Sequence, residues 1–234
     1  MMTLRPWEKL PDSMRMEAVR PYYDVLSRHR AALVLKRLFD AAASVVLMVV
    51  LFPLMLMIAA AVRLDTPGPV LFFQERVTAY EKRFMIWKYR TMFSGAEQKG
   101  TQVTVSNDRR ITRVGRFIRK CRLDELPQLV NIFRGDMSFV GTRPEVVRYV
   151  DRYTPEMMAT LLLPAGVTSE ASILYKDENR LLSGAGDTDE VYVRDILPEK
   201  MKYNLKALKE FSCRREVMTM IRTVLAMLGK QYRG

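Results

Sequence analysis

The sequence predicts an α+β protein that is monotopic in a membrane, with an N-terminal re-entrant helix broken at a proline. Three observations predict it: an uncharged stretch over residues 41–62, two strand-like segments soon after it, and amphipathic helical segments in the remainder. The expected division is an N-terminal extension at 1–35, a membrane helix at 36–62 and a small cytoplasmic domain at 63–234. At 49% hydrophobic, the 234-residue chain can bury a core.

The composition excludes several kinds of site. His29 is the one histidine, so a zinc site with several histidines or an HExxH pair is excluded. Cys121 and Cys213 form no CxxC pair, which favours a reduced chain facing the cytoplasm. Any transfer or hydrolytic chemistry must therefore rest on carboxylates, lysines, arginines or an added metal ion.

The positive charge is concentrated in one region. The formal net charge is +12, and residues 63–123 hold 14 basic and 5 acidic side chains, a net of +9. Residues 124–234 hold 16 of each, so their net is zero. Such an excess calls for an anionic partner, which can be nucleic acid, phospholipid or a phosphate-bearing substrate.

The uncharged stretch has the length of a membrane helix. Its 22 residues would make a helix of about 33 Å, against a hydrocarbon core of about 30 Å. Pro53 falls near its middle, and basic residues flank both ends, which the positive-inside rule places in the cytoplasm. A re-entrant helix satisfies both observations, while an ordinary span that tolerates a proline is the alternative.

The elements around the stretch follow from local patterns. Residues 1–35 have helical character that Pro21 interrupts. A turn at 65–69 precedes two predicted strands, 70–77 and 84–92, which are rich in β-branched and aromatic residues, and residues 94–108 form a polar loop.

The second half is predicted to be mainly helical. Residues 109–122 form a basic amphipathic helix, which can be an interfacial helix on anionic lipid or an ordinary surface helix. A short helix at 125–133 ends before Gly135. The remaining predictions are turns at 141–144 and 164–166, an acidic loop at 183–189, and helices from Pro198 to about 211 and over 214–228.

Two adjacent carboxylates, Asp124 and Glu125, follow a run of arginines that includes Arg119. Neighbours on a helix point about 100° apart, so the two can take different roles, one attacking and one binding a metal. Acidic residues that complement the dipole in a first helical turn are the simpler explanation of the same pattern.

Two further segments suit phosphate binding. Arg143 stands between Thr142 and Pro144 in a turn, where a guanidinium can bind phosphate through two hydrogen bonds. Lys88 and Arg90 have the same parity on the second predicted strand and therefore share a face. A surface turn and a solvated strand face are the ordinary alternatives.

The chain resembles the bacterial sugar transferase family, the small monotopic phosphoglycosyl transferases that begin glycan assembly on polyprenyl phosphate. The similarity runs from about Lys36 to beyond Phe211. It is carried by Lys36-Arg37-Leu38-Phe39-Asp40, Pro67-Gly68-Pro69, Gln74-Glu75-Arg76, Lys88-Tyr89-Arg90-Thr91-Met92, Leu123-Asp124-Glu125-Leu126-Pro127-Gln128 and Gly135-Asp136-Met137-Ser138.

The resemblance implies a catalytic domain over 63–234 and a re-entrant helix broken at Pro53. It implies that Asp124 attacks the β-phosphate of a UDP-sugar and releases UMP, and that the phospho-sugar then passes to polyprenyl phosphate. Glu125, with Asp124, would form the Mg²⁺ site. Phosphate and nucleotide contacts would come from Lys88, Arg90, Arg119, Thr142, Arg143 and Pro144.

The chain departs from the family pattern twice. Thr142-Arg143-Pro144 stands where the family usually has Pro-Arg-Pro, which puts nucleotide contacts there in question. Pro164-Ala165-Gly166-Val167-Thr168 lacks the basic residue with which the family's segment begins, which puts a phosphate contact expected there in question.

The expected place of this protein is the cytoplasmic face of the bacterial inner membrane. Its expected partners are a UDP-sugar, polyprenyl phosphate and membrane phospholipids; nucleic acid is not needed, and a homodimer stays open. Two alternatives remain: direct transfer with Asp124 as a base, and a basic membrane-attached binding module without catalysis.

Overall fold

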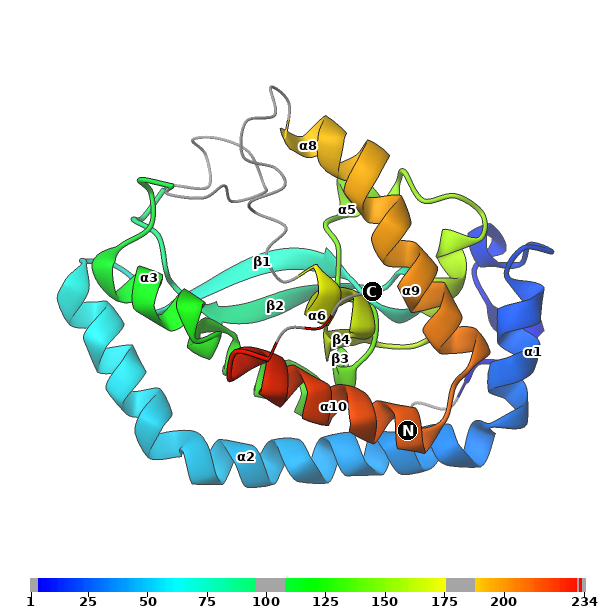
Figure 1. Ribbon diagram of the computed structural model, residues 1–234, viewed down its shortest axis with the longest axis horizontal. Helices are drawn as coiled ribbons and strands as arrows, with labels where there is room; N and C mark the ends of the chain where they lie inside the picture. Colours follow the sequence, from blue (N-terminus) through cyan, green and yellow to red (C-terminus); the bar gives the residue numbers. More distant parts are fainter. Residues whose placement is uncertain (1–3, 96–107, 176–187, 231, 233–234) are drawn as a thin grey trace.

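The computed structural model describes residues 4–95, 108–175, 188–230 and 232. The predicted polar loop at 94–108 and acidic loop at 183–189 lie mostly outside these residues. Within them, helices and two small sheets are mixed (Figure 1). The α+β class predicted from the sequence is confirmed in this respect.

The first sheet is the predicted hairpin. β1 (Leu71–Val77) pairs antiparallel with β2 (Arg83–Tyr89), with Leu71 opposite Tyr89 and Val77 opposite Arg83. The turn between them contains Tyr80 and Glu81, with φ of 58° and 59°, a left-handed conformation that non-glycine residues seldom adopt.

The second sheet was not predicted. β3 (Met137–Val140) pairs in parallel with β4 (Ala165–Thr168), where the sequence predicts a turn over 164–166. That prediction is wrong because the close approach of two segments of the chain decides the backbone conformation of residues 165 and 166. A Cβ atom on Gly166 would lie 2.1 Å from the nitrogen of Gly141, so glycine permits the pairing here.

The N-terminal region contains two successive helices. α1 (Arg20–Arg28) has Pro21 in its first turn, so this proline begins a helix rather than interrupting one. α2 (Arg30–Asp65) continues through Pro53 and bends in its second half (Figure 1). Its most apolar window has a mean hydropathy of 2.9 and is 11% buried, so α2 is long and apolar enough to cross a membrane.

The remaining helical segments include the two long helices expected near the C-terminus. These are α9 (Leu197–Lys209) and α10 (Cys213–Met227), which match the predictions at 198–211 and 214–228 closely. The segments are α3 (Arg113–Lys120), η5 (Leu123–Glu125), α4 (Gln128–Arg134), α5 (Val147–Val150), η6 (Met157–Leu162), α6 (Glu170–Leu174), α8 (Thr188–Val191), the π-helical turn η7 (Tyr192–Ile196), α9 (Leu197–Lys209) and α10 (Cys213–Met227).

Polar side chains anchor the start of α2 to the second sheet. Lys36 Nζ donates to the Val140 carbonyl at 2.9 Å, and Asp40 accepts from Ser138 Oγ at 2.7 Å. Asp40 is only 3% exposed although most side chains around it on α2 are not buried. A buried carboxylate needs such partners, so the apolar helix is fixed to β3 at this point.

Arg90 binds the chain at the C-terminal end of α2. Its guanidinium donates to the carbonyls of Thr66 at 2.7 Å and Pro67 at 2.6 Å, just beyond the helix. The side chain is buried, with the residue 6% exposed. Carbonyls at a helix C-terminus lack partners inside the helix, and Arg90 supplies them with donors.

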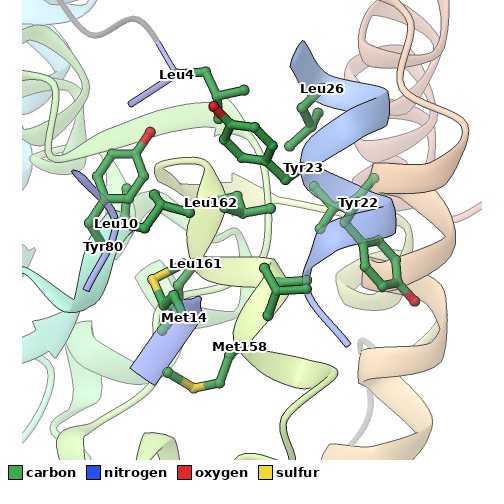
Figure 2. Close-up of a cluster of buried hydrophobic side chains, with 14 of the residues drawn as sticks. Leu4, Leu10, Met14, Tyr22, Tyr23, Leu26, Tyr80, Met158, Leu161 and Leu162 are labelled. Carbon is green, nitrogen blue, oxygen red and sulfur yellow. The ribbon is translucent and has the colours of Figure 1, made fainter. Parts of the chain in front are cut away.

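The residues before α1 belong to the main hydrophobic core rather than to a loose appendage (Figure 2). Leu4, Leu10 and Met14 pack in one cluster with residues of α1, the β1–β2 turn and η6. Tyr80 of that turn accepts a hydrogen bond from the Arg5 nitrogen at 3.1 Å. The N-terminal segment therefore supports the far end of the hairpin.

Candidate functional site

Asp124 and Glu125 lie in the short turn η5, between the basic helix α3 and α4. Arg122, just before the turn, has a φ of 53°, which reverses the chain after α3. Next, Asn131 of α4 bonds to the main chain of β2: its Oδ1 accepts from Trp87 N at 3.0 Å and its Nδ2 donates to the Met85 carbonyl at 2.8 Å. The carboxylates are thereby held beside the end of β2.

Glu125 is buried between two cations. Its side chain is 9% exposed; Arg143 donates a hydrogen bond to Oε1, and Lys88 Nζ lies 3.6 Å from the same oxygen. Burial would raise the pKa of Glu125, but the positive charges of Arg143 and Lys88 outweigh it and lower that pKa well below its usual range. Glu125 is therefore a carboxylate at every physiological pH.

The environment of Asp124 acts in the opposite direction. Burial and the neighbouring charge of Glu125 raise the pKa of Asp124, although Lys88, Arg119 and Arg143 draw it down. The two adjacent carboxyl groups thus differ: Glu125 is tightly ion-paired, whereas Asp124 is the more basic. Two neighbouring carboxyl groups whose pKa values are shifted in opposite directions are typical of sites where they take different roles.

Lys88 projects from the end of β2 toward the carboxylates, and its side chain is 20% exposed. Burial lowers the pKa of Lys88 to about 8, with Arg143 and Arg76 adding to the effect and Glu125 opposing it. A lysine whose pKa is shifted this far by burial and by specific neighbouring charges is a candidate functional residue.

Three cations act on Asp124, and Arg76 nearby is itself paired with Glu145. Lys88, Arg119 and Arg143 all act electrostatically on Asp124, and Arg76 of β1 is close enough to act on Lys88. Burial lowers the pKa of Arg119 and of Arg76. Because the cations outnumber the carboxylates, the cluster has room for additional negative charge.

The structure separates the predicted phosphate-binding residues into two groups. It brings Lys88, Arg119 and Arg143 together at Asp124 and Glu125. It places Arg90 at the end of α2 instead. Thr142 and Pro144 support Arg143 through their carbonyls, which accept from Gly166 N at 2.8 Å and from Arg76 at 3.1 Å.

Several residues near the site were not predicted. Arg76 is part of a quoted motif, yet nothing in the sequence indicated that it lies beside Pro144 and Glu145. Glu145, Tyr192 and Lys200 form a buried polar group behind Arg143. They are up to 55 residues apart in sequence and belong to no spaced pattern that could have linked them.

The donor set fits Mg²⁺ when a phosphate group accompanies it. Among the described residues, no group of three or more His, Cys, Asp or Glu side chains is arranged for a metal. Mg²⁺ in proteins commonly takes one or two carboxylates and fills its shell with phosphate oxygens and water. Asp124 and Glu125 would be those carboxylates, and the surrounding cations disfavour an ion that arrives alone.

The chain is similar to known proteins over most of its length. Residues 31–230 match the family model described as bacterial sugar transferase. A UDP-N-acetylgalactosamine-undecaprenyl-phosphate N-acetylgalactosaminephosphotransferase from Aeromonas hydrophila is 34% identical over 197 residues, 83% of this chain and 44% of the relative. A UDP-glucose:undecaprenyl-phosphate glucose-1-phosphate transferase from Caulobacter vibrioides is 34% identical over 196 residues, 82% of this chain and 69% of the relative.

A third relative carries the same activity in its name. The UDP-glucose:undecaprenyl-phosphate glucose-1-phosphate transferase of Escherichia coli is 31% identical over 193 residues. Those residues are 81% of this chain and 39% of the relative. The chain therefore spans less than half the length of the Aeromonas and Escherichia proteins, and about two thirds of the Caulobacter protein.

Proposed function

The chain belongs to the bacterial sugar transferase family, and on that premise we propose that it transfers a sugar-1-phosphate from a UDP-sugar to undecaprenyl phosphate. The named relatives act on different UDP-sugars but share the lipid acceptor. The observation that carries the proposal is the pair Asp124 and Glu125 among a larger number of partly buried cations, because a sugar diphosphate and a lipid phosphate both bring negative charge.

In the proposed first step, an Asp124 Oδ attacks the β-phosphorus of the UDP-sugar. A bond forms between that oxygen and phosphorus, and the bond from phosphorus to the bridging oxygen breaks, so that UMP leaves with the electron pair. The higher basicity of Asp124 makes it the better nucleophile of the two carboxylates. Lys88, Arg119 and Arg143 offset the repulsion between carboxylate and diphosphate.

In the proposed second step, a phosphate oxygen of undecaprenyl phosphate attacks the same phosphorus. Asp124 leaves as a carboxylate, and the product is undecaprenyl diphosphate sugar. When bound, Mg²⁺ would neutralise charge on the phosphate oxygens and on the leaving UMP. Glu125, held ionised by Arg143 and Lys88, is its proposed ligand with Asp124.

The test is the first half-reaction. The protein is mixed with Mg²⁺ and a radiolabelled UDP-sugar in the absence of any lipid acceptor, across a panel of UDP-sugars. We expect about one UMP per chain and label bound to the protein with the accepted sugar. Turnover that requires the lipid and leaves no label on the protein would favour direct transfer with Asp124 as a base. No reaction with or without the lipid would favour a binding module.

Lys88 makes the reaction sensitive to pH. Because burial lowers its pKa to about 8, its charge is present below that pH and is lost as the pH rises through it. We therefore expect kcat/KM for the UDP-sugar to fall above pH 8, by up to about tenfold per pH unit. Lys88→Arg, which stays charged, should move this fall to higher pH; an unchanged profile in that variant would contradict the assignment.

We further propose that α2 enters and leaves the membrane on the cytoplasmic side. Large apolar side chains are exposed on α2, on α3 and along α10, for example Val49 (70%), Phe117 (63%) and Val224 (57%). The ion pair between Lys36 and Glu216 joins α2 to α10. The bend in α2 and the basic residues at both of its ends support re-entry.

The topology can be read by labelling introduced cysteines. Arg20→Cys and Val70→Cys, each made after Cys121 and Cys213 are replaced by serine, lie on either side of α2. A membrane-impermeant thiol reagent should label both in inside-out vesicles and neither in intact cells. Labelling of one position from each side would establish an ordinary span.

A further inference from the structure

Behind Arg143 lies a buried chain of polar groups to which neither the sequence nor the comparisons assign a role. Glu145, two residues after Arg143, is 6% exposed. Its Oε1 accepts a hydrogen bond from the Tyr192 hydroxyl at 2.5 Å, and that hydroxyl accepts one from Lys200 Nζ at 3.1 Å. Lys200 is 4% exposed.

The same carboxylate also faces the site. Arg76 NH1 lies 3.9 Å from Glu145 Oε2 and donates to the Pro144 carbonyl at 3.1 Å. The Glu145 carbonyl accepts from Val77 N at 3.0 Å. Pro144 and Glu145, the two residues that follow Arg143, are thus both tied to the end of β1.

This polar chain joins segments that would otherwise be independent. Tyr192 begins the π-helical turn η7, and Lys200 lies two turns further on in α9. π-helical turns occur frequently at functional sites. The Tyr192 ring packs against Tyr149 of α5, with ring centroids 5.0 Å apart. The ring contact and the hydrogen bonds to Glu145 and Lys200 together fix the position of the Tyr192 hydroxyl.

The segment that carries Arg143 needs such support. Residues 141–146 have no helix or strand of their own. The Arg143 side chain must nevertheless reach Glu125, which it contacts directly. Burying Glu145, Arg76 and Lys200 together is costly unless each is paired, and a paired buried network restricts the backbone that carries it.

We propose that Glu145 is a positioning residue for Arg143, and that Tyr192 and Lys200 hold Glu145 in that position. The inference rests on the proposed function, in which Arg143 binds the diphosphate of the UDP-sugar. It assigns α9 and η7 a part in nucleotide binding although neither touches the carboxylates Asp124 and Glu125 in any contact identified among the described residues.

The test is Tyr192→Phe, which removes the hydroxyl and keeps the ring on Tyr149. We expect UDP to bind about tenfold more weakly, as measured by isothermal titration, because the bond lost is one to a charged group. KM for the UDP-sugar should rise by a similar factor while kcat at saturation stays close to that of the unchanged protein. Lys200→Met should have the same effect.

Tyr203→Phe is the matched control, because Tyr203 lies on the same α9 and packs its ring against Tyr175. A second comparison repeats Tyr192→Phe in an Arg143→Ala background. If the network acts through Arg143, the tenfold loss should disappear there. An equal loss in both backgrounds, or a lowered thermal midpoint with unchanged UDP affinity, would overturn the inference.

The two proposals fail in distinguishable ways. If the unchanged protein binds no UDP and releases no UMP from any UDP-sugar, the proposed function fails and this inference with it. If the unchanged protein binds UDP and Tyr192→Phe binds it equally well, only the positioning role of Glu145 is wrong.

Discussion

Asp124→Asn is expected to abolish turnover, lowering kcat by on the order of 10⁴-fold or more. The amide has nearly the same shape but cannot attack phosphorus as a carboxylate does. The measurement is UMP release with UDP-sugar, Mg²⁺ and undecaprenyl phosphate, together with retention of label on the protein.

The free energy of unfolding of Asp124→Asn distinguishes a loss of catalysis from a loss of folded protein. Burial and Glu125 already raise the pKa of Asp124, so the folded state disfavours its charge. A neutral amide there should leave the free energy of unfolding unchanged or slightly higher. Asp136→Asn is the control, since Asp136 is also largely buried and paired with Lys82: it should keep turnover. Strong activity in Asp124→Asn would contradict the proposed role of Asp124.

Arg143→Ala is expected to lower kcat/KM for the UDP-sugar by about 10²–10³-fold. The variant removes the group that is hydrogen-bonded to Glu125 and leaves that carboxylate with Lys88 Nζ, 3.6 Å away. Removing one partner of a buried ion pair also costs about 3–5 kcal/mol of folding free energy, so a lower thermal midpoint should accompany the kinetic loss.

Arg143→Lys distinguishes charge from geometry. It restores the positive charge without the planar fork of the guanidinium. We expect it to recover most of the thermal stability and only part of kcat/KM. Full recovery of both would show that Arg143 acts as a point charge, and unchanged kcat/KM in Arg143→Ala would remove it from the site.

The sequence predicted the elements whose patterns are local. The hairpin β1–β2 is found within a few residues of the predicted strands because β-branched and aromatic residues run through both. β4 was missed because Pro164-Ala165-Gly166 has the composition of a turn, and it becomes a strand through its parallel pairing with β3.

In the candidate site, too, residues that are adjacent in sequence could be predicted, whereas residues that are distant in sequence could not. Asp124, Glu125 and their arginines could be selected because they are adjacent in sequence. Arg90 was grouped with Lys88 by strand parity, but β2 ends at Tyr89 and the following residue turns to the end of α2 instead. Glu145, Tyr192 and Lys200 meet only in the folded chain, so no local pattern could have identified them.

The position of the N-terminal segment has a consequence for biosynthesis. Leu4, Leu10 and Met14 leave the ribosome well before Met158, Leu162 and Phe211, which are among their neighbours in the core. This cluster cannot be complete until Phe211 has been made, by which time the long apolar helix α2 has already left the ribosome. Contacts so distant in sequence are slow to form, so we expect membrane insertion to precede the folding of the domain.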